Sequence, residues 1–157
     1  MADNPQYVTL GVAEDLFAAP IERVQEILEM RPIARLPRAP ANLLGMIDVR
    51  SRAVPVIDLR AILGLPLVAG TPNTRIVVLW IKSGGRDLTV GLKTDRVFEV
   101  TVLDDPELDP PPEAAVTWNA HAIAGIGRRN GAFVTVFDLD QLFGGAEIAA
   151  LGTPEAA

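Results

Sequence analysis

Hydrophobic and polar residues alternate in short segments along most of the chain, and turn-forming residues separate these segments. Such alternation predicts strands that are half buried, and frequent glycine and proline between short strands are typical of all-β domains. The predicted strands cover residues 7–12, 43–49, 54–57, 75–81, 88–92 and 133–137. Because closure into barrels would protect the edges of such short strands, we predict an all-β fold with a few short helices, arranged as two small β-barrels.

Residues 20–29 are the main departure from this alternation. Pro20 suits the first turn of a helix, and the apolar residues that follow recur at helical spacing, which favours a helix. The same apolar residues also fit a strand that leaves a short helical turn. Both interpretations stay open at this point.

A unit of strand, turn, strand and short helix occurs twice, at an offset of 80 residues. The matching pairs are Gly45/Gly125, Val54/Val134, Val56/Val136, Asp58/Asp138, Leu59/Leu139 and Gly64/Gly144. A shorter match relates residues 23–27 to residues 96–100. The repeat predicts one domain over residues 1–157, with approximate halves 5–68 and 73–144, segments that can be exchanged between the barrels, and a tail at 145–157.

Residues typical of turns and helix caps define where the elements of the two copies begin and end. Asp58 and Asp138 each stand where a strand gives way to a helical stub, which is an N-cap position. Asn130 and Gly131 predict a type I′ hairpin turn in the second copy. Pro55 cannot donate a ladder hydrogen bond, so we expect a sheet edge or a bulge there.

Composition and charge narrow the classes of function. The net charge of −6 argues against nucleic acid as a partner. The chain has no cysteine and begins with no leader-like segment, and its longest apolar run, residues 76–81, is far shorter than the ~20 residues of a membrane helix. We therefore expect a cytoplasmic protein without membrane insertion. Residues 104–113 carry five acids and no base, which predicts a solvated linker.

Candidate chemistry is sparse. His121 is the only histidine, and the two serines, Ser51 and Ser83, lie in predicted turns without a nucleophile context. The Asp58–Asp138 pair would be a candidate for acid–base work, but matching local contexts explain these residues better as two helix caps. The sequence thus predicts no catalytic residue, no metal site and no cofactor.

Several segments resemble one known family. The blocks YVTLGV, FAAPIERVQEI, LPRAPANLLGMIDVRSRAVPVIDLRAILG, VGLKTDRVFEV and AIAGIGRRNGAFVTVFDLDQLF are similar to the CheW family of bacterial chemotaxis coupling proteins, over residues 7–143. The resemblance implies two packed SH3-like, five-stranded β-barrels. It also implies a non-catalytic adaptor that joins the cytoplasmic tip of methyl-accepting chemoreceptors to the regulatory domain of the histidine kinase CheA, at receptor arrays on the inner face of the membrane or in cytoplasmic clusters.

Two alternatives remain beside this expectation. One is a coupling protein of the same fold in a parallel pathway, such as type IV pilus or developmental signalling. The other belongs to a different class, a small ligand-binding barrel or an enzyme, which a polar pocket around His121 or around Asp58 and Asp138 would favour.

The resemblance also carries over a kinase-binding position. Ile21 and Val24 fall where the family makes an apolar contact with the kinase domain. Exposed aliphatic side chains at this spacing would form a compact apolar patch. The competing interpretation is that both side chains belong to the core.

The receptor-binding region of the family aligns with Leu44, Gly45 and Arg50, and Glu26 aligns with the partner of Arg50 in an ion pair. Gly45 is expected to allow close approach of a partner helix. Relatives carry glycine where this chain has Ser51. If the turn requires a positive φ, serine there costs on the order of 1 kcal/mol; otherwise the turn has another shape.

Overall fold

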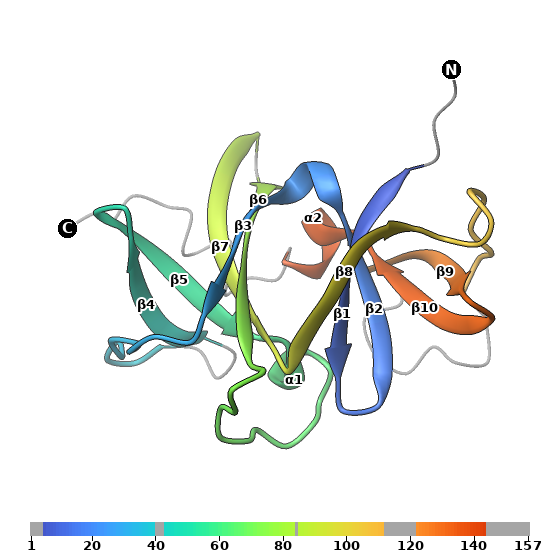
Figure 1. The fold of residues 1–157 in the computed structure, drawn as a ribbon. Helices are drawn as coiled ribbons and strands as arrows, with labels where there is room; N and C mark the ends of the chain where they lie inside the picture. The colour runs from blue at the N-terminus through green and yellow to red at the C-terminus, as the bar shows by residue number, and fades with distance from the viewer. Residues whose placement is uncertain (1–4, 40–42, 84, 112–121, 144–157) are drawn as a thin grey trace.

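A computed structural model of the chain describes residues 5–39, 43–83, 85–111 and 122–143. These residues form two five-stranded sheets that lie side by side, as Figure 1 shows. The strands of the first sheet are β1 (Gln6–Val12), β2 (Asp15–Pro20), β8 (Arg96–Val102), β9 (Ile123–Arg129) and β10 (Ala132–Phe137). Their order is β8-β1-β2-β10-β9, and only the β10–β2 pair is parallel.

The second sheet repeats this arrangement. Its strands are β3 (Val24–Glu29), β4 (Leu43–Val49), β5 (Arg52–Asp58), β6 (Arg75–Ser83) and β7 (Arg86–Thr94), in the order β3-β6-β7-β5-β4. The β5–β7 pair is parallel, as β10–β2 is in the first sheet. The helical elements are η1 (Ile21–Arg23), α1 (Leu59–Ile62) and α2 (Leu139–Leu142). The mostly-β prediction is confirmed.

The first sheet combines strands from both ends of the chain, whereas the second is built from consecutive strands. The first sheet joins β1 and β2 to β8, β9 and β10, whereas the second joins β3, β4 and β5 to β6 and β7. In the two sheet orders β3 takes the place of β8, and the hairpin β4–β5 takes the place of β9–β10. The repeated sequence blocks therefore occupy equivalent places in the two sheets.

The core is continuous across both sheets. One large cluster of buried side chains takes members from both, among them Leu10 and Phe137 in the first sheet and Leu79 and Leu92 in the second. Smaller clusters fill the outer part of each barrel. Because the largest cluster is shared, the barrels stabilise each other through buried apolar surface.

The helix favoured for residues 20–29 is wrong. Only η1 is helical, and the chain continues as β3, which pairs antiparallel with β6. Half-buried and exposed residues alternate along β3, because one face packs on the core and the other faces solvent. The open alternative, a strand that leaves a short helical turn, is correct.

The details predicted for the two hairpins are confirmed. The Asp58 carboxylate accepts the Arg60 backbone N–H at 2.9 Å, and Asp138 accepts that of Gln141 at 3.3 Å, so each caps its helix. The segment of β5 with Pro55 pairs only with β4, since the ladder with β7 begins at Val56. No helix in the described ranges is long and apolar enough to cross a membrane.

Candidate protein-interaction site

An ion pair joins one edge strand of the second barrel to the turn that follows the other edge strand. Arg50 Nε lies 3.3 Å from Glu26 Oε2, and the Arg50 side chain is 80% exposed while that of Glu26 is 25% exposed. Glu26 belongs to β3 and Arg50 to the β4–β5 turn, which lie at opposite ends of the strand order. The pair therefore links the two ends of the strand order, β3 and the β4–β5 hairpin, where the sheet closes into a barrel. An exposed pair of this kind adds only about 0–1 kcal/mol, so its main effect is to hold the Arg50 guanidinium in place.

The turn that carries Arg50 has the shape of its counterpart in the other barrel. Arg50 and Ser51 have φ values of +55° and +68°, and Asn130 and Gly131 have +54° and +85°. Positive φ at both central residues defines a type I′ turn, which suits the twist of a hairpin. The first copy thus keeps the turn shape although neither residue is glycine. Two outcomes were expected for Ser51: a strained backbone at positive φ, or a turn of another shape. The structure shows the first, since Ser51 has a positive φ in a turn like that of the second copy.

Gly45 is buried beneath the protein's own chain. It has a φ of +148°, and a Cβ atom on it would lie 2.2 Å from the Ala34 carbonyl oxygen and 2.8 Å from Ile33 Cγ2. Ala34 and Met46 exchange two backbone hydrogen bonds of 2.8 Å, which hold the segment after β3 over this position. The close approach expected from a partner helix is therefore made by Ala34. Contact between Gly45 and a receptor stays a prediction.

The two candidate kinase-binding residues are half buried. Ile21 lies in η1 and Val24 begins β3, and both pack against the shared core while keeping part of their surface exposed. The core and contact interpretations therefore both apply to these side chains. Leu44 is likewise half buried and packs against the outer cluster of the second barrel.

A clamp on Arg23 fixes the segment between these two apolar residues. The Arg23 guanidinium donates to both carboxylate oxygens of Asp140 at 2.7 and 3.0 Å and lies 4.5 Å from the Trp80 ring centroid. Asp140 also accepts the Lys82 backbone N–H at 2.8 Å. The hydrogen bonds from Arg23 are the main cause that lowers the pKa of Asp140. The clamp ties η1 to α2 and β6, so it positions the apolar patch.

A second clamp occurs at the corresponding place in the other copy, with its charges reversed. Arg60 in α1 donates to Asp95 at 2.9 and 2.7 Å, and Asp95 also accepts the Ala13 backbone N–H at 2.7 Å. These contacts, with the Arg60 hydrogen bond foremost, lower the pKa of Asp95. Arg60 aligns with Asp140 at the 80-residue offset. Because Arg60 aligns with an acid, and Arg23 aligns with Arg96 and not with Asp95, the sequence repeat did not reveal either clamp.

The first barrel also has its own ion pair between edge strands. Arg129 Nε lies 3.3 Å from Glu99 Oε2. The carboxylate of Asp104 accepts the backbone N–H groups of Asn130 and Gly131, both at 2.9 Å, and these bonds lower its pKa. The start of the acidic segment therefore caps the β9–β10 turn. Asp104 is itself exposed, so its carboxylate is both solvated, as expected for this segment, and bonded to the turn.

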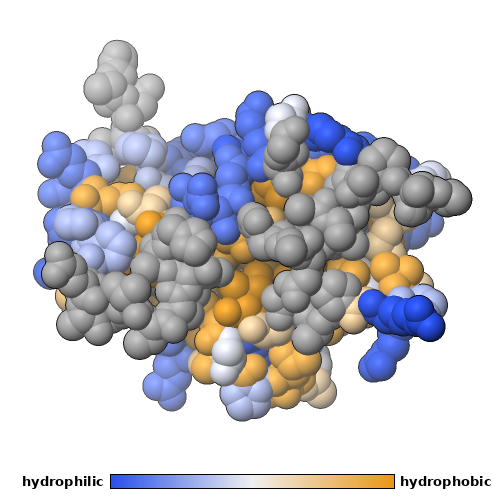
Figure 2. All heavy atoms as spheres, turned by 180° about the vertical axis from the view of Figure 1, so that it is seen from behind, coloured by the Kyte–Doolittle hydropathy of each residue, from blue (hydrophilic) through white to orange (hydrophobic). Residues whose placement is uncertain are grey.

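Sequence reasoning did not single out the exposed apolar side chains, some of which lie in strands and others in the segments between them. Figure 2 shows that apolar side chains reach the surface on the face turned away in Figure 1. The largest exposed apolar residues within the described ranges are Ile27, Leu36, Leu67, Val68, Phe98, Val100 and Phe133. Such surface is available for contact with other proteins.

The described residues contain no group of three or more His, Cys, Asp or Glu side chains that could hold a metal ion. His121, the candidate centre of a polar pocket, lies outside the described residues. Asp58 lies 3.6 Å from Lys93 Nζ and caps α1, while Asp138 caps α2. Each carboxylate therefore serves the local structure of its own copy.

Comparison with known proteins adds an independent line of evidence. The model of the CheW-like domain family matches residues 6–147. Chemotaxis protein CheW of Klebsiella aerogenes is 31% identical, with 90% of this chain and 81% of the relative covered, and that of Rhizobium meliloti is 28% identical, with 88% and 86% covered. The crystal structure of scaffolding protein CheW from Thermoanaerobacter tengcongensis is similar with a TM-score of 0.80 and 26% identity, covering 94% of this chain and 92% of that chain.

Proposed function

The chain belongs to the CheW-like domain family, and we propose from this membership that it is a chemotaxis adaptor that couples methyl-accepting receptors to the histidine kinase CheA. The observation that carries the proposal is the family match over nearly the whole chain, together with the similarity to a structure named a scaffolding protein. The adaptor is non-catalytic and acts in the cytoplasm, at receptor arrays or clusters. The two partner contacts lie on η1 and on the second barrel, which η1 leads into.

The kinase contact lies on η1 and the start of β3. Ile21 and Val24 present part of their apolar surface there, and the Arg23 clamp holds the segment rigid. A rigid apolar patch binds with a smaller loss of conformational entropy than a mobile one. These features support contact with the regulatory domain of CheA.

The receptor contact lies at the edge of the second barrel. Arg50 is largely exposed and held by Glu26, and Leu44 flanks the same edge beside Gly45. An arginine fixed in one pose offers a directed donor set to carboxylates or backbone carbonyls of a helical hairpin. The proposed receptor contact at the edge strands is thus polar, whereas the proposed kinase contact on η1 and β3 is apolar.

A binding experiment with single variants tests these assignments. Purified CheA regulatory domain is titrated with the wild type, I21D and the control V68D, which changes an exposed aliphatic residue in a linker. We expect I21D to weaken binding by about 2 kcal/mol, which corresponds to roughly thirtyfold, and V68D to bind as the wild type does. Thermal unfolding of I21D shows whether the fold persists, since Ile21 also contacts the core.

The receptor side is tested in the same assay format. R50A should fold normally and bind the kinase domain normally, because its side chain is exposed, but it should weaken binding to a receptor cytoplasmic fragment. Unimpaired receptor binding by R50A would refute the receptor assignment. Loss of folding would refute the view that Arg50 is a contact residue.

A further inference from the structure

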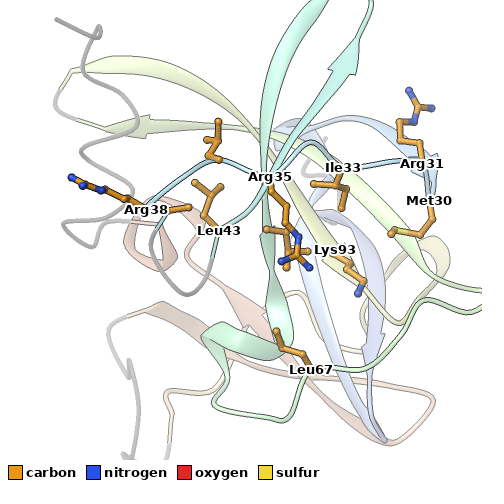
Figure 3. Close-up of a pocket in the computed structure, with 11 residues that line it drawn as sticks. Met30, Arg31, Ile33, Arg35, Arg38, Leu43, Leu67 and Lys93 are labelled. Carbon is orange, nitrogen blue, oxygen red and sulfur yellow. The ribbon is translucent and has the colours of Figure 1, made fainter. Parts of the chain in front are cut away.

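A surface cleft lies at the end of the second sheet where β3 and β7 finish and β4 begins. Its volume is about 650 Å³, within the range of about 300–1,000 Å³ that is typical of ligand sites. The segment after β3 forms one wall, the start of β4 forms the floor, and Leu67 and Lys93 lie opposite (Figure 3). Of the candidate contact residues above, the cleft includes only Leu44.

The lining of the cleft is basic, although the chain as a whole carries a charge of −6. Four of the described lining residues are cations and none is an acid. Lys93 is neutralised by Asp58 behind it at 3.6 Å. Arg35 and Arg38 form no ion pair with any residue in the described ranges. Arg31 likewise forms no ion pair there, so three of the four lining cations are unpaired among the described residues.

Figure 3 shows how the cations are placed. Arg35 and Lys93 point to the same side, above Leu67, whereas Arg31 and Arg38 point outward. Arg38 has a φ of +60°, a left-handed conformation that is uncommon for arginine. Strained backbone of this kind is concentrated at contact and ligand sites, so Arg38 agrees with a binding role for this wall.

Apolar side chains lie between the cations. Leu36 is 37% exposed and Leu67 is 51% exposed, and both line the cleft beside the buried Leu43. Protein–protein interfaces have an apolar centre, a polar rim and an enrichment of arginine, and leucines flanked by arginines match this composition. A free small anion would leave these leucines uncovered.

We propose that this cleft binds an acidic, extended segment of a partner protein, with an aliphatic side chain on the leucines, one carboxylate on Arg35 and a second, flanking carboxylate on Arg38 at the outer rim. Guanidinium groups pair bidentately with carboxylates, which gives the site its preference for Asp and Glu. The net charge of −6 disfavours binding of such a segment to the chain as a whole, so the basic lining gives the cleft its preference. This inference does not depend on the identity of the receptor or kinase contacts.

The probe is the peptide Glu-Asp-Leu-Asp-Glu-amide with fluorescein on its N-terminal amine, titrated with the full chain and followed by fluorescence anisotropy. We expect saturable binding that weakens with salt, and about tenfold weaker binding to R35E and to R38E, which corresponds to ~1.4 kcal/mol. The matched control R86E changes an exposed arginine in the β6–β7 hairpin, outside the cleft lining, and should bind as the wild type does. R35K should bind less tightly than the wild type but more tightly than R35E. Circular dichroism confirms the fold of each variant.

Four results would overturn the proposal. The first is equal binding of the peptide by R35E and by the wild type, and the second is equal binding by the wild type of a peptide with Gln and Asn in place of Glu and Asp. The third is cosedimentation of the wild type with phosphatidylserine vesicles that the R35E change abolishes. The fourth is concentration-dependent dimerisation of the wild type that the R35E change abolishes. The third would assign the cleft to a membrane surface and the fourth to a second copy of the chain. An absence of saturable peptide binding below about 1 mM would also overturn it.

Discussion

Replacement of Ser51 by glycine should stabilise the protein. Ser51 has a φ of +68° in a type I′ turn, where a non-glycine residue costs roughly 1–2 kcal/mol relative to the right-handed region. Its side chain is exposed and forms no hydrogen bond within the described part of the chain. Glycine removes this strain but gains about 0.5–1 kcal/mol of conformational freedom in the unfolded chain. The net expectation is a gain of about 0.5–1 kcal/mol.

The assay is urea unfolding followed by far-UV circular dichroism, with S51G beside the wild type. The midpoint should rise with an unchanged m value, and the melting temperature should rise by ~1–4 °C for a chain of this length. The reverse change, G131S, places serine at φ +85° in the other copy and should destabilise by a similar amount. If S51G leaves the free energy of unfolding unchanged or lowers it, the reasoning about strain in this turn is wrong.

Two further changes test packing and electrostatics. G45A should lower the free energy of unfolding in urea by about 3 kcal/mol or more, because a Cβ atom would clash with the Ala34 carbonyl oxygen. The control G64A, at φ +77° with open space around it, should lower the free energy of unfolding by only about 1 kcal/mol. D140N should cost about 1–2 kcal/mol at pH 7 by weakening the clamp on Arg23. Folding lowers the pKa of Asp140 from 3.8. The ionised carboxylate therefore makes its full contribution to the free energy of unfolding above pH 3.8, and this contribution is lost as the pH falls through the folded pKa. The difference between D140N and wild type should therefore narrow in urea titrations at pH 3, and a constant difference would contradict the clamp.

Local features of the fold were predictable because they depend on neighbours in sequence. The caps at Asp58 and Asp138 and the turn at Asn130 and Gly131 follow from the residue types that helix starts and type I′ turns require. The mostly-β architecture follows from the two-residue alternation. The Glu26–Arg50 pair came from the family resemblance, since nothing in the residues alone relates positions 24 apart.

Other features depend on contacts between distant segments, which leave no periodic signal. The helix favoured for residues 20–29 yields to β3 because pairing with β6 outweighs local spacing. The glycine at position 45 indicated a close approach, but only the structure shows that Ala34 makes it. The Arg23–Asp140 clamp joins residues 117 positions apart, and Arg60 of its counterpart aligns with an acid, so the repeat hid both.

Receptor-dependent activation of the kinase tests the central claim most directly. CheA and a receptor cytoplasmic fragment on vesicles are combined with and without this chain, and kinase autophosphorylation is measured. We expect autophosphorylation to depend on the receptor only when the chain is present, and R50A and I21D each to reduce that dependence. Equal autophosphorylation with and without the chain, under conditions in which all three proteins are folded, would contradict its role as a coupling adaptor.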